Sequence, residues 1–393
     1  MQICLVSTIG YPTRTKLGGV PTYTRTIAHA LAREGHRVFV ITHGAGKALT
    51  HEQDGPVDVY WAPMGNVHYY FGRLFPRLGI WPRVAKTFEW GLAIRRLLSQ
   101  IMKTEGVDVV QYPNVWTEGI FHPTRIGMAV RMNTPLCVAR PIAGCGDQPG
   151  WGTYERLEQS IVRRSDLVSC HTSSIADLVA REYGISHRKI VTIPNPIDVE
   201  RFKPLPRPPG QPPRIFHPGP RLDDWQKGTR VLLQAMDQVL EGLPAAELYV
   251  AGRGELPTAG VSDRVLEATT VLGWLDHAAL ATQYALADVT VVPSLNWEAF
   301  GNVCIESFAS ATPVIASDIG GLSDVITPGQ TGSLVPPGDV QALADAVLEA
   351  LSDLDSCAQM GQQARQEAET RYSFTAVARR TADAFSYIAG SSQ

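Results

Sequence analysis

The chain has 393 residues, a net charge of −3 and 19% charged side chains, which is typical of an ordinary globular protein. The length predicts two domains of ~100–200 residues each, and the charge balance gives no general preference for nucleic acid. The stretch 1–10 predicts a first strand rather than a signal peptide, and no run approaches the ~18 apolar residues that span a bilayer.

The first predicted element group is a parallel βαβ unit. A strand over 3–7 leads to a loop with Gly18 and Gly19, a helix over 20–34 and a strand over 37–41. The alternation continues with strands expected at 107–112, 128–131, 167–169 and 190–193, and helices at 154–164 and 174–182. Strand, helix and strand in this order predict a parallel sheet.

A proline-rich connector at 204–213 can form neither a helix nor a central strand. Beyond it, strands are predicted at 214–217, 247–251, 289–292 and 314–316, and helices at 229–240, 277–285, 340–351 and in the tail from Cys357. The predicted fold is therefore α/β, with two Rossmann-like doubly wound domains over 1–203 and 214–372. We expect their strand ends to face one another across a cleft.

The most informative segment lies between Pro293 and Glu306. The strand at 289–292 ends there, and a helix begins near Asn302. Ligands of open α/β sheets bind outside the carboxyl ends of the strands, and a helix N-terminus presents free amides to an anion. The amides of Gly301, Asn302 and Val303 are therefore predicted to hold a phosphate.

Two glutamates flank this predicted phosphate site. Glu306 lies four residues beyond Asn302, about 6 Å along the helix, where a carboxylate could accept hydrogen bonds from paired ribose hydroxyls. Glu298 precedes the helix, where a donor sugar would project. Either residue alone is also explained as a surface carboxylate or as a glutamate favoured by the helix dipole, but the pair in this loop favours a ligand site.

The segment resembles the retaining GT-B glycosyltransferases of family 4, whose signature is Glu-x7-Glu in a Pro-Ser…Glu-x-Phe-Gly…Glu stretch. The agreement continues over about forty residues, through these motifs: Glu298-Ala-Phe-Gly with Phe300, Thr312-Pro-Val, Gly320-Gly321, Gly329-Gln-Thr-Gly332 and Val335-Pro-Pro-Gly-Asp339. The resemblance implies transfer of a sugar from a nucleotide diphosphate-sugar donor to a hydroxyl acceptor, such as a glycan, a lipid-linked molecule or a small molecule. It implies no metal and no other cofactor.

Further positions are implied by the same resemblance. Arg221 and Lys227 lie on the loop where the family neutralises the donor diphosphate, and two cations beside a glycine turn suit a departing pyrophosphate. Gly18 and Gly19 match the family's glycine loop, where backbone amides approach the phosphate closely. The last segment, 373–393, corresponds to the helix that returns to the first domain.

One position departs from the family pattern. The family commonly has a histidine after the strand before the Thr-Pro pair of the first domain, and Asn133 takes that place here. Asparagine donates and accepts hydrogen bonds but does not titrate. His122 and His171 are alternative candidates, although a lone histidine is more often structural.

The segment 68–98 is unusually basic and aromatic. Six cations are opposed by Glu89 alone, with seven aromatic residues interleaved. Such a surface could lie on an anionic membrane, hold a sugar on an aromatic face or bind an anionic acceptor. The other interpretation is a helical hairpin whose aromatics belong to the core. With six cysteines and no Cys-x-x-Cys pair, we expect a reduced, cytoplasmic protein, with the membrane's inner face as one location.

Other functions fit the motifs less well. A dehydrogenase would need Gly-x-Gly-x-x-Gly after the first strand, and a P-loop would need a glycine where Ile41 stands. A GT-B epimerase does not need the Glu-x7-Glu loop, and a phosphorylase would take phosphate as co-substrate. A catalytically degenerate relative that only binds nucleotide sugar or glycan is the non-enzymatic alternative, and Asn133 is the residue that favours it.

Overall fold

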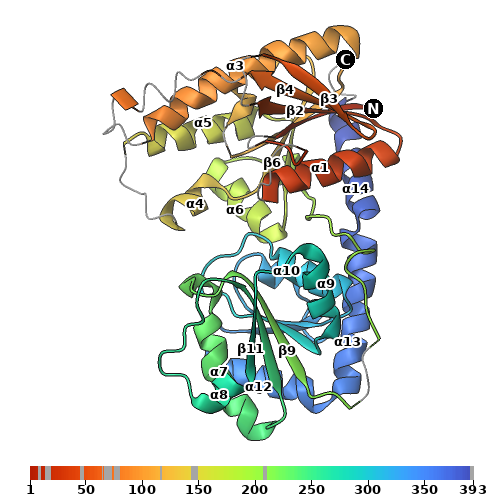
Figure 1. Ribbon diagram of the computed structural model, residues 1–393. Coiled ribbons are helices and arrows are strands. Elements are labelled where there is room, and N and C mark those ends of the chain that lie inside the picture. The colour runs from red at the N-terminus through yellow and green to blue at the C-terminus, as the bar shows by residue number, and fades with distance from the viewer. Residues whose placement is uncertain are drawn as a thin grey trace. The chain divides into compact units, whose positions relative to one another are not determined.

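The computed structural model describes residues 1–7, 10–13, 19–44, 48–63, 65, 73–74, 80–115, 117–142, 149–206 and 210–389. The chain divides into two compact units, unit 1 (Met1–Pro196 with Val377–Gln393) and unit 2 (Ile197–Ala376). Each unit is a parallel sheet interleaved with helices (Figure 1). The two Rossmann-like domains predicted from the alternating pattern are thus confirmed.

Within its described residues, unit 1 holds an eight-stranded sheet in the order β3-β4-β2-β1-β5-β6-β7-β8. Every neighbouring pair is parallel except the hairpin of β3 and β4, which the sequence pattern did not reveal. Its strands are β1 (Gln2–Ser7), β2 (Arg37–Gly44), β3 (Thr50–Asp54), β4 (Val57–Pro63), β5 (Val109–Pro113), β6 (Gly127–Met132), β7 (Leu167–Cys170) and β8 (Ile190–Thr192).

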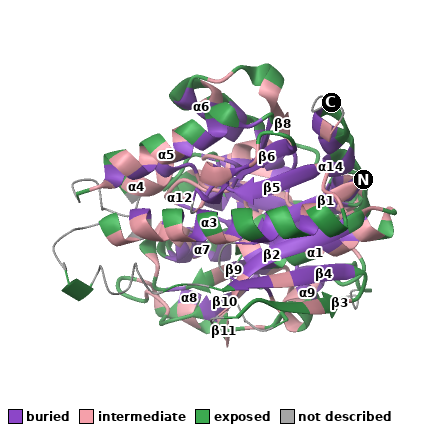
Figure 2. Cartoon of the chain, turned by 90° about the horizontal axis from the view of Figure 1, so that it is seen from above, coloured by how far each residue is buried: buried purple, intermediate pink, exposed green. Residues whose placement is uncertain are grey.

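The helices of unit 1 follow the strands and shield the sheet. They are α1 (Gly19–Arg33), α3 (Trp81–Thr104), α4 (Leu136–Ile142), α5 (Trp151–Arg164), α6 (Ser173–Tyr183) and α14 (Phe374–Ala389). Figure 2 shows the strands β2 and β5 in the purple of buried residues, whereas α1 and α3 turn green, exposed stretches outward. Strands buried on both faces carry apolar runs such as Val38–Ile41, in which every side chain is buried.

Unit 2 has, within its described residues, a six-stranded sheet that is parallel throughout, in the order β11-β10-β9-β12-β13-β14. Numbered from β9, this is the doubly wound order 3-2-1-4-5-6. The strands are β9 (Arg214–Arg221), β10 (Glu247–Arg253), β11 (Thr269–Gly273), β12 (Val289–Val292), β13 (Val314–Ser317) and β14 (Gly332–Val335). The helices are α7 (Thr229–Gly242), α8 (Asp263–Glu267), α9 (His277–Leu286), α10 (Asn302–Ala309), α11 (Leu322–Val325), α12 (Val340–Ser352) and α13 (Leu354–Glu367).

The boundary between the units lies at Pro196, earlier than the expected end of the first domain at residue 203. Ile197 and Phe202 are buried in the core of unit 2, which explains the difference. Ile197 also donates its N–H to Tyr372 O at 2.8 Å. The chain therefore joins unit 2 through packing several residues before the proline-rich stretch begins.

The C-terminal helix α14 begins beside this boundary and belongs mostly to unit 1. From Val377 onward its residues belong to that unit. Arg379 Nε lies 2.9 Å from Oε2 of Glu34, the residue that follows α1. A Cβ atom added to Gly127 of β6 would lie 3.1 Å from Ile388 O. The last helix therefore packs closely on the strands of unit 1.

No helix within the described ranges has both the length and the apolar character needed to cross a membrane.

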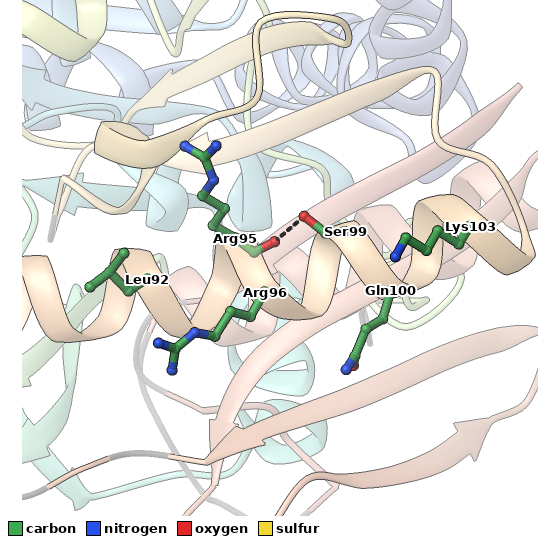
Figure 3. A pocket seen from close by; sticks show the side chains of 6 residues that line it. All are labelled: Leu92, Arg95, Arg96, Ser99, Gln100 and Lys103. Carbon is green, nitrogen blue, oxygen red and sulfur yellow. Dashed lines mark hydrogen bonds between the residues drawn. The ribbon is translucent and has the colours of Figure 1, made fainter.

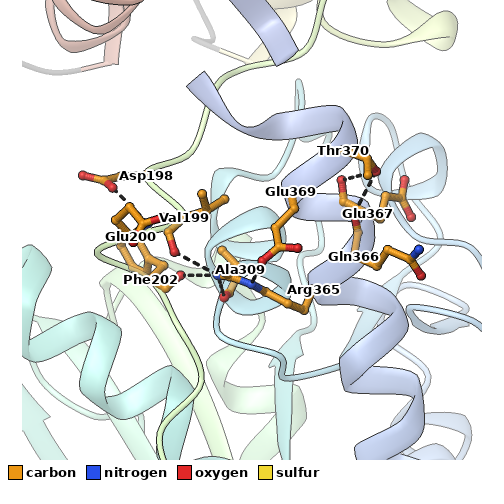
Figure 4. A network of polar contacts seen from close by, with 10 residues as sticks. All are labelled: Asp198, Val199, Glu200, Phe202, Ala309, Arg365, Gln366, Glu367, Glu369 and Thr370. Atoms are coloured by element: carbon orange, nitrogen blue, oxygen red, sulfur yellow. Dashed lines mark hydrogen bonds and ion pairs between the residues drawn. The ribbon is translucent and has the colours of Figure 1, made fainter. Parts of the chain in front are cut away.

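Arg365 of α13 holds the start of unit 2 in place (Figure 4). Its Nη1 donates hydrogen bonds to Val199 O at 2.9 Å, Phe202 O at 2.8 Å and Ala309 O at 2.5 Å. Its Nε also pairs with Glu369 at 2.7 Å. One guanidinium thus satisfies three carbonyls from segments more than fifty residues apart in the sequence.

Replacing this arginine, Arg365→Met, should lower the free energy of unfolding of unit 2 by about 3 kcal/mol, because three carbonyls lose a charged donor. The matched control is Arg371→Met, which removes the pair with Glu367 and a contact over the Tyr372 ring but no hydrogen bond to a backbone carbonyl, and it should cost less than about 1 kcal/mol. Urea denaturation followed by circular dichroism measures both. Equal losses in the two variants would contradict the role given to Arg365.

Candidate active site

Two loops of unit 2 meet beyond the carboxyl ends of β9 and β12, the neighbouring strands at which the strand order reverses. Leu295 N donates to Gln226 O at 2.8 Å, and Asn296 Nδ2 donates to Gln226 Oε1 at 2.9 Å. Gly228 has a φ of 67°, and a Cβ there would lie 1.8 Å from Pro293 O. A glycine is therefore required for the two loops to approach this closely.

The predicted residues Lys227 and Glu298 form an ion pair across these loops. Lys227 Nζ lies 2.5 Å from Glu298 Oε1, and each side chain keeps about a quarter of its surface exposed (27% and 23%). Ser294 Oγ donates to the same carboxylate oxygen at 3.1 Å. The structure thus brings a cation and an anion, 71 positions apart in the sequence, to one point at the edge of the sheet.

The glycine pair Gly320 and Gly321 supports this loop from behind. Gly321 N donates to Glu298 O at 2.7 Å. A Cβ at Gly320 would lie 2.5 Å from Glu298 O, and one at Gly321 would lie 2.4 Å from Ala299 O. The Gly-Gly motif seen in the sequence therefore has a steric reason: only glycines let this turn approach the backbone that carries Glu298.

Helix α10 begins directly after this turn. Gly301 precedes it in the left-handed region, with φ 86° and ψ 64°, and a Cβ there would lie 2.5 Å from Leu322 Cδ2. The predicted residues Asn302 and Val303 are the first two residues of the helix, where the amides and the helix dipole favour an anion. Phe300 is buried against Tyr372, with ring centroids 6.0 Å apart, so its ring supports the turn from inside the core.

Glu306 lies one turn along α10 and is held by a tyrosine. Tyr284 of α9 donates its hydroxyl hydrogen to Glu306 Oε2 at 2.9 Å. The tyrosine is itself buried, with its ring edge-on to Phe216 at 5.1 Å. Burial raises the pKa of the Glu306 carboxyl to about 7. Tyr284 could not be identified from the sequence, because nothing local marks a tyrosine 22 positions away as a partner of Glu306.

Arg221 lies at the end of β9, on the loop that carries Lys227, but it has another partner. Its Nε and Nη2 contact Asp223 at 2.9 and 2.5 Å, and the arginine side chain is 60% exposed. This pairing raises the pKa of Arg221 above its usual value. Arg221 therefore pairs with Asp223, whereas Lys227 pairs with Glu298.

Asn133 occupies the equivalent edge of unit 1. It follows β6, and its backbone N–H donates to Asn114 Oδ1 at 2.9 Å. Asn114 follows β5, the strand beside β1 where the order of this sheet reverses. Sequence reasoning missed Asn114 and its buried partner Glu158 of α5, to which it donates at 2.6 Å. Gly19 opens α1, and a Cβ added there would meet no atom of the described residues within 4 Å; Gly18 lies outside the described residues.

The two histidines considered as alternatives are buried structural residues. His122 contacts Tyr112 OH at 3.0 Å through Nδ1 and Ile126 O at 2.9 Å through Nε2. His171 Nδ1 lies 3.3 Å from Arg131 Nη2. Burial lowers the pKa of both imidazoles. The structural interpretation of both side chains therefore fits their contacts better than a role in proton transfer.

Within the described ranges, no group of three or more histidine, cysteine, aspartate or glutamate side chains is arranged to hold a metal ion. The charged side chains described above have other partners: Lys227 pairs with Glu298, and Glu306 accepts a hydrogen bond from Tyr284.

Comparison with known proteins agrees with this architecture. The family model described as "Glycosyltransferase Family 4" matches residues 17–201, and "Glycosyl transferases group 1" matches residues 212–353. A glycogen synthase from Mycobacterium tuberculosis is 30% identical over 408 residues, covering 98% of this chain and 94% of the relative. This chain belongs to the group 1 glycosyltransferases of family 4. It is therefore a sugar-transferring enzyme.

Two further comparisons extend this result. A phosphatidyl-myo-inositol mannosyltransferase from Mycobacterium leprae is 35% identical over 192 residues, which are 48% of this glycosyltransferase and 51% of the relative. The solved structure of sucrose-phosphate synthase from Thermosynechococcus elongatus superposes with a TM-score of 0.75 at 23% identity, covering 99% of each chain. That similarity supports the GT-B fold.

The half-buried carboxyl of Glu306 predicts how stability depends on pH. The folded state holds this proton up to its raised pKa of about 7, whereas the unfolded chain releases it near the ordinary pKa of 4.5. Between these values the folded state binds more protons, so the free energy of unfolding falls as pH rises. Glu306→Gln should remove this contribution and flatten the decline between pH 5 and 7.5, as measured by urea denaturation. An unchanged slope would show that the carboxyl titrates normally.

Proposed function

We propose that this glycosyltransferase moves a sugar, with retention of anomeric configuration, from a nucleoside diphosphate donor to a hydroxyl acceptor. The observation that carries the proposal is the Lys227–Glu298 pair, fixed beside the N-terminus of α10 at the point where the strand order of unit 2 reverses. A cation and a helix N-terminus at this edge suit a diphosphate. A carboxylate beside them suits the hydroxyls of a sugar.

In this proposal each residue has a distinct task. The amides of Gly301, Asn302 and Val303 and the ammonium of Lys227 bind the diphosphate, and Arg221 adds a second cation when it leaves Asp223. Glu306 accepts hydrogen bonds from the ribose hydroxyls, with Tyr284 fixing its second oxygen. Glu298 orients the transferred sugar, and Asn133 hydrogen-bonds the reacting groups from unit 1.

The chemical step follows from these tasks. The bond between the anomeric carbon and the diphosphate oxygen breaks while the acceptor oxygen forms a bond to the same face of that carbon. The departing phosphate oxygen takes the proton of the acceptor hydroxyl. Negative charge grows on the diphosphate as it leaves, so Lys227 and the helix amides stabilise the transition state more than the ground state.

The donor class is tested by thermal-shift titration with UDP, GDP, ADP, dTDP and their sugars, without added metal. We expect one nucleotide to raise the melting temperature, since a ligand that binds only the folded state stabilises it. Glu306→Ala should weaken the binding of that nucleotide about 10-fold or more, and Lys227→Met should lower kcat. The control Arg230→Met removes an exposed cation three residues further on and should change neither value.

The outcomes separate the alternatives. No shift with any nucleotide would contradict the proposed donor site. Binding without donor consumption, for any acceptor tried, would favour a catalytically degenerate relative in which Asn133 has replaced a required group.

We further propose that unit 1 contacts an anionic membrane surface through the exposed face of α3. Arg95, Arg96 and Lys103 line a shallow pocket there together with Leu92, Ser99 and Gln100 (Figure 3). Along the same helix Trp81, Phe88 and Leu92 are 38–42% exposed. Cations beside exposed apolar side chains are typical of interfacial helices. In contrast Trp90 is buried, so the aromatics of this segment serve both core and surface.

Only part of the segment 68–98 supports this argument, since residues 66–72 and 75–79 lie outside the described residues. The relative named for phosphatidyl-myo-inositol acts, by that name, on a lipid. A lipid-linked acceptor would therefore suit this surface, whereas a soluble acceptor would leave it without a function.

Membrane contact is tested by co-sedimentation with neutral and with anionic phospholipid vesicles. Each basic residue near an anionic surface contributes about 1 kcal/mol, so Arg95→Gln/Arg96→Gln/Lys103→Gln should weaken binding to anionic vesicles by about 100-fold. The control Arg188→Gln/Arg230→Gln/Arg380→Gln makes the same change in net charge at exposed residues elsewhere. Equal binding to both vesicle types, or equal loss in both variants, would contradict the proposal.

A further inference from the structure

A buried carboxylate lies directly behind the turn that carries Asn133. Glu158 of α5 is 1% exposed and accepts three hydrogen bonds. Asn114 Nδ2 donates to Oε1 at 2.6 Å, Leu136 N donates to Oε2 at 3.0 Å, and the Tyr183 hydroxyl also donates to Oε2. We call Glu158 and Asn114 the Glu158 frame.

The frame fixes both ends of the turn at 133–136. Asn114 Oδ1 accepts from Asn133 N at 2.9 Å, and Asn114 Nδ2 donates to Thr134 O at 2.9 Å. Asn133 Nδ2 also lies 3.5 Å from Asn114 Oδ1. Glu158 also accepts a hydrogen bond directly from Leu136 N. Two side chains, Asn114 and Glu158, therefore hydrogen-bond three backbone groups of this four-residue turn.

The orientation of the Asn114 amide depends on Glu158. The carboxylate and Thr134 O both require a donor, so Nδ2 faces them and Oδ1 must face Asn133. A flipped amide would place an NH2 group against the Asn133 N–H. The hydrogen bonds that the buried Glu158 carboxyl accepts therefore define the position of the turn.

Titratable groups face Glu158 from three helices. Tyr183 faces Glu158 from α6, Cys137 faces it from α4, and Glu155 lies on α5 itself. Burial raises the pKa of Glu158 to about 7, while the hydrogen bonds from Tyr183, Asn114 and Leu136 act in the opposite direction. Removing any of these donors would leave the carboxylate poorly compensated.

We propose that Glu158 is a positioning residue of the transfer reaction: acting through Asn114 and the Leu136 amide, it holds Asn133 against the reacting groups. The inference rests on the proposed function, in which Asn133 hydrogen-bonds those groups. Asn114 and Asn133 follow the neighbouring strands β5 and β6, next to the point where the strand order of unit 1 reverses. Catalytic geometry at such an edge requires supporting contacts, because a displacement of about 1 Å can cost 100-fold in rate.

The first test is Glu158→Gln, which keeps the shape of the side chain but replaces one accepting carboxylate oxygen by a donating NH2 group. Whichever way the new amide turns, its NH2 faces either Asn114 Nδ2 or the Leu136 N–H. We expect kcat to fall about 10-fold or more, while affinity for the nucleoside diphosphate, which binds to unit 2, stays within about twofold. The control Tyr112→Phe removes the buried hydrogen bond to His122 in the same unit and should leave kcat unchanged despite a loss of stability.

The second test exchanges the two groups. In Asn114→Asp/Glu158→Gln the introduced amide donates to the introduced carboxylate, whose other oxygen still accepts from the Asn133 N–H. Only Thr134 O loses its donor. The kcat of the double variant should therefore be at least threefold higher than that of Glu158→Gln. Two independent structural losses would instead lower kcat below that of Glu158→Gln.

Amide hydrogen exchange at 133–136 supplies a readout that needs no activity. Exchange there should accelerate in Glu158→Gln and stay unchanged in Tyr112→Phe. Unchanged exchange in Glu158→Gln would overturn the frame, and accelerated exchange with normal kcat would overturn the positioning role. The proposed function is tested separately, on the wild-type protein alone. If the wild-type protein transferred no sugar, the proposed function would be refuted, whatever the variants showed.

Discussion

The reversal of strand order in each sheet is the constraint on which the positions of the candidate residues in each unit depend. In a parallel sheet, the loops that follow the strands all lie at the edge formed by the carboxyl ends of the strands. Where two neighbouring strands connect to helices in opposite directions, their loops diverge and leave space for a ligand between them. In unit 2 this happens between β9 and β12, and in unit 1 between β1 and β5. Lys227 and Glu298 lie at the first of these places, and Asn114 lies at the second.

Close backbone approach makes these loops rigid enough to hold charged groups. Gly228, Gly301, Gly320 and Gly321 each stand where a Cβ atom would lie 1.8–2.5 Å from a neighbouring atom. The loops therefore pack against one another through their backbones, and the polar side chains project from a fixed support. The cost is conformational: each glycine loses more freedom on folding than another residue would.

A carboxyl group held by a tyrosine occurs in both units, the half-buried Glu306 with Tyr284 and the buried Glu158 with Tyr183. Burial raises the pKa of each carboxyl to about 7, so each is costly to keep ionised. Such costs are usually found where the group has a function. The two glutamates differ in their surroundings, since Glu306 stands beside the helix N-terminus while Glu158 is enclosed behind the Asn133 turn.

The sequence alone determined the two α/β domains, because strand periodicity, glycine turns and helix starts are local signals. It also predicted a site in the loop from Pro293 to Gly301 with Glu298 and Glu306, and the family resemblance added Lys227. It also identified Arg221 and Phe300, but not that Arg221 pairs with Asp223 or that Phe300 faces the core. Only the tertiary structure revealed Tyr284, Asn114 and Glu158 and set the unit boundary at Pro196. These features depend on contacts between residues 22 or 44 positions apart and on which apolar side chains each core buries, and no local pattern encodes either.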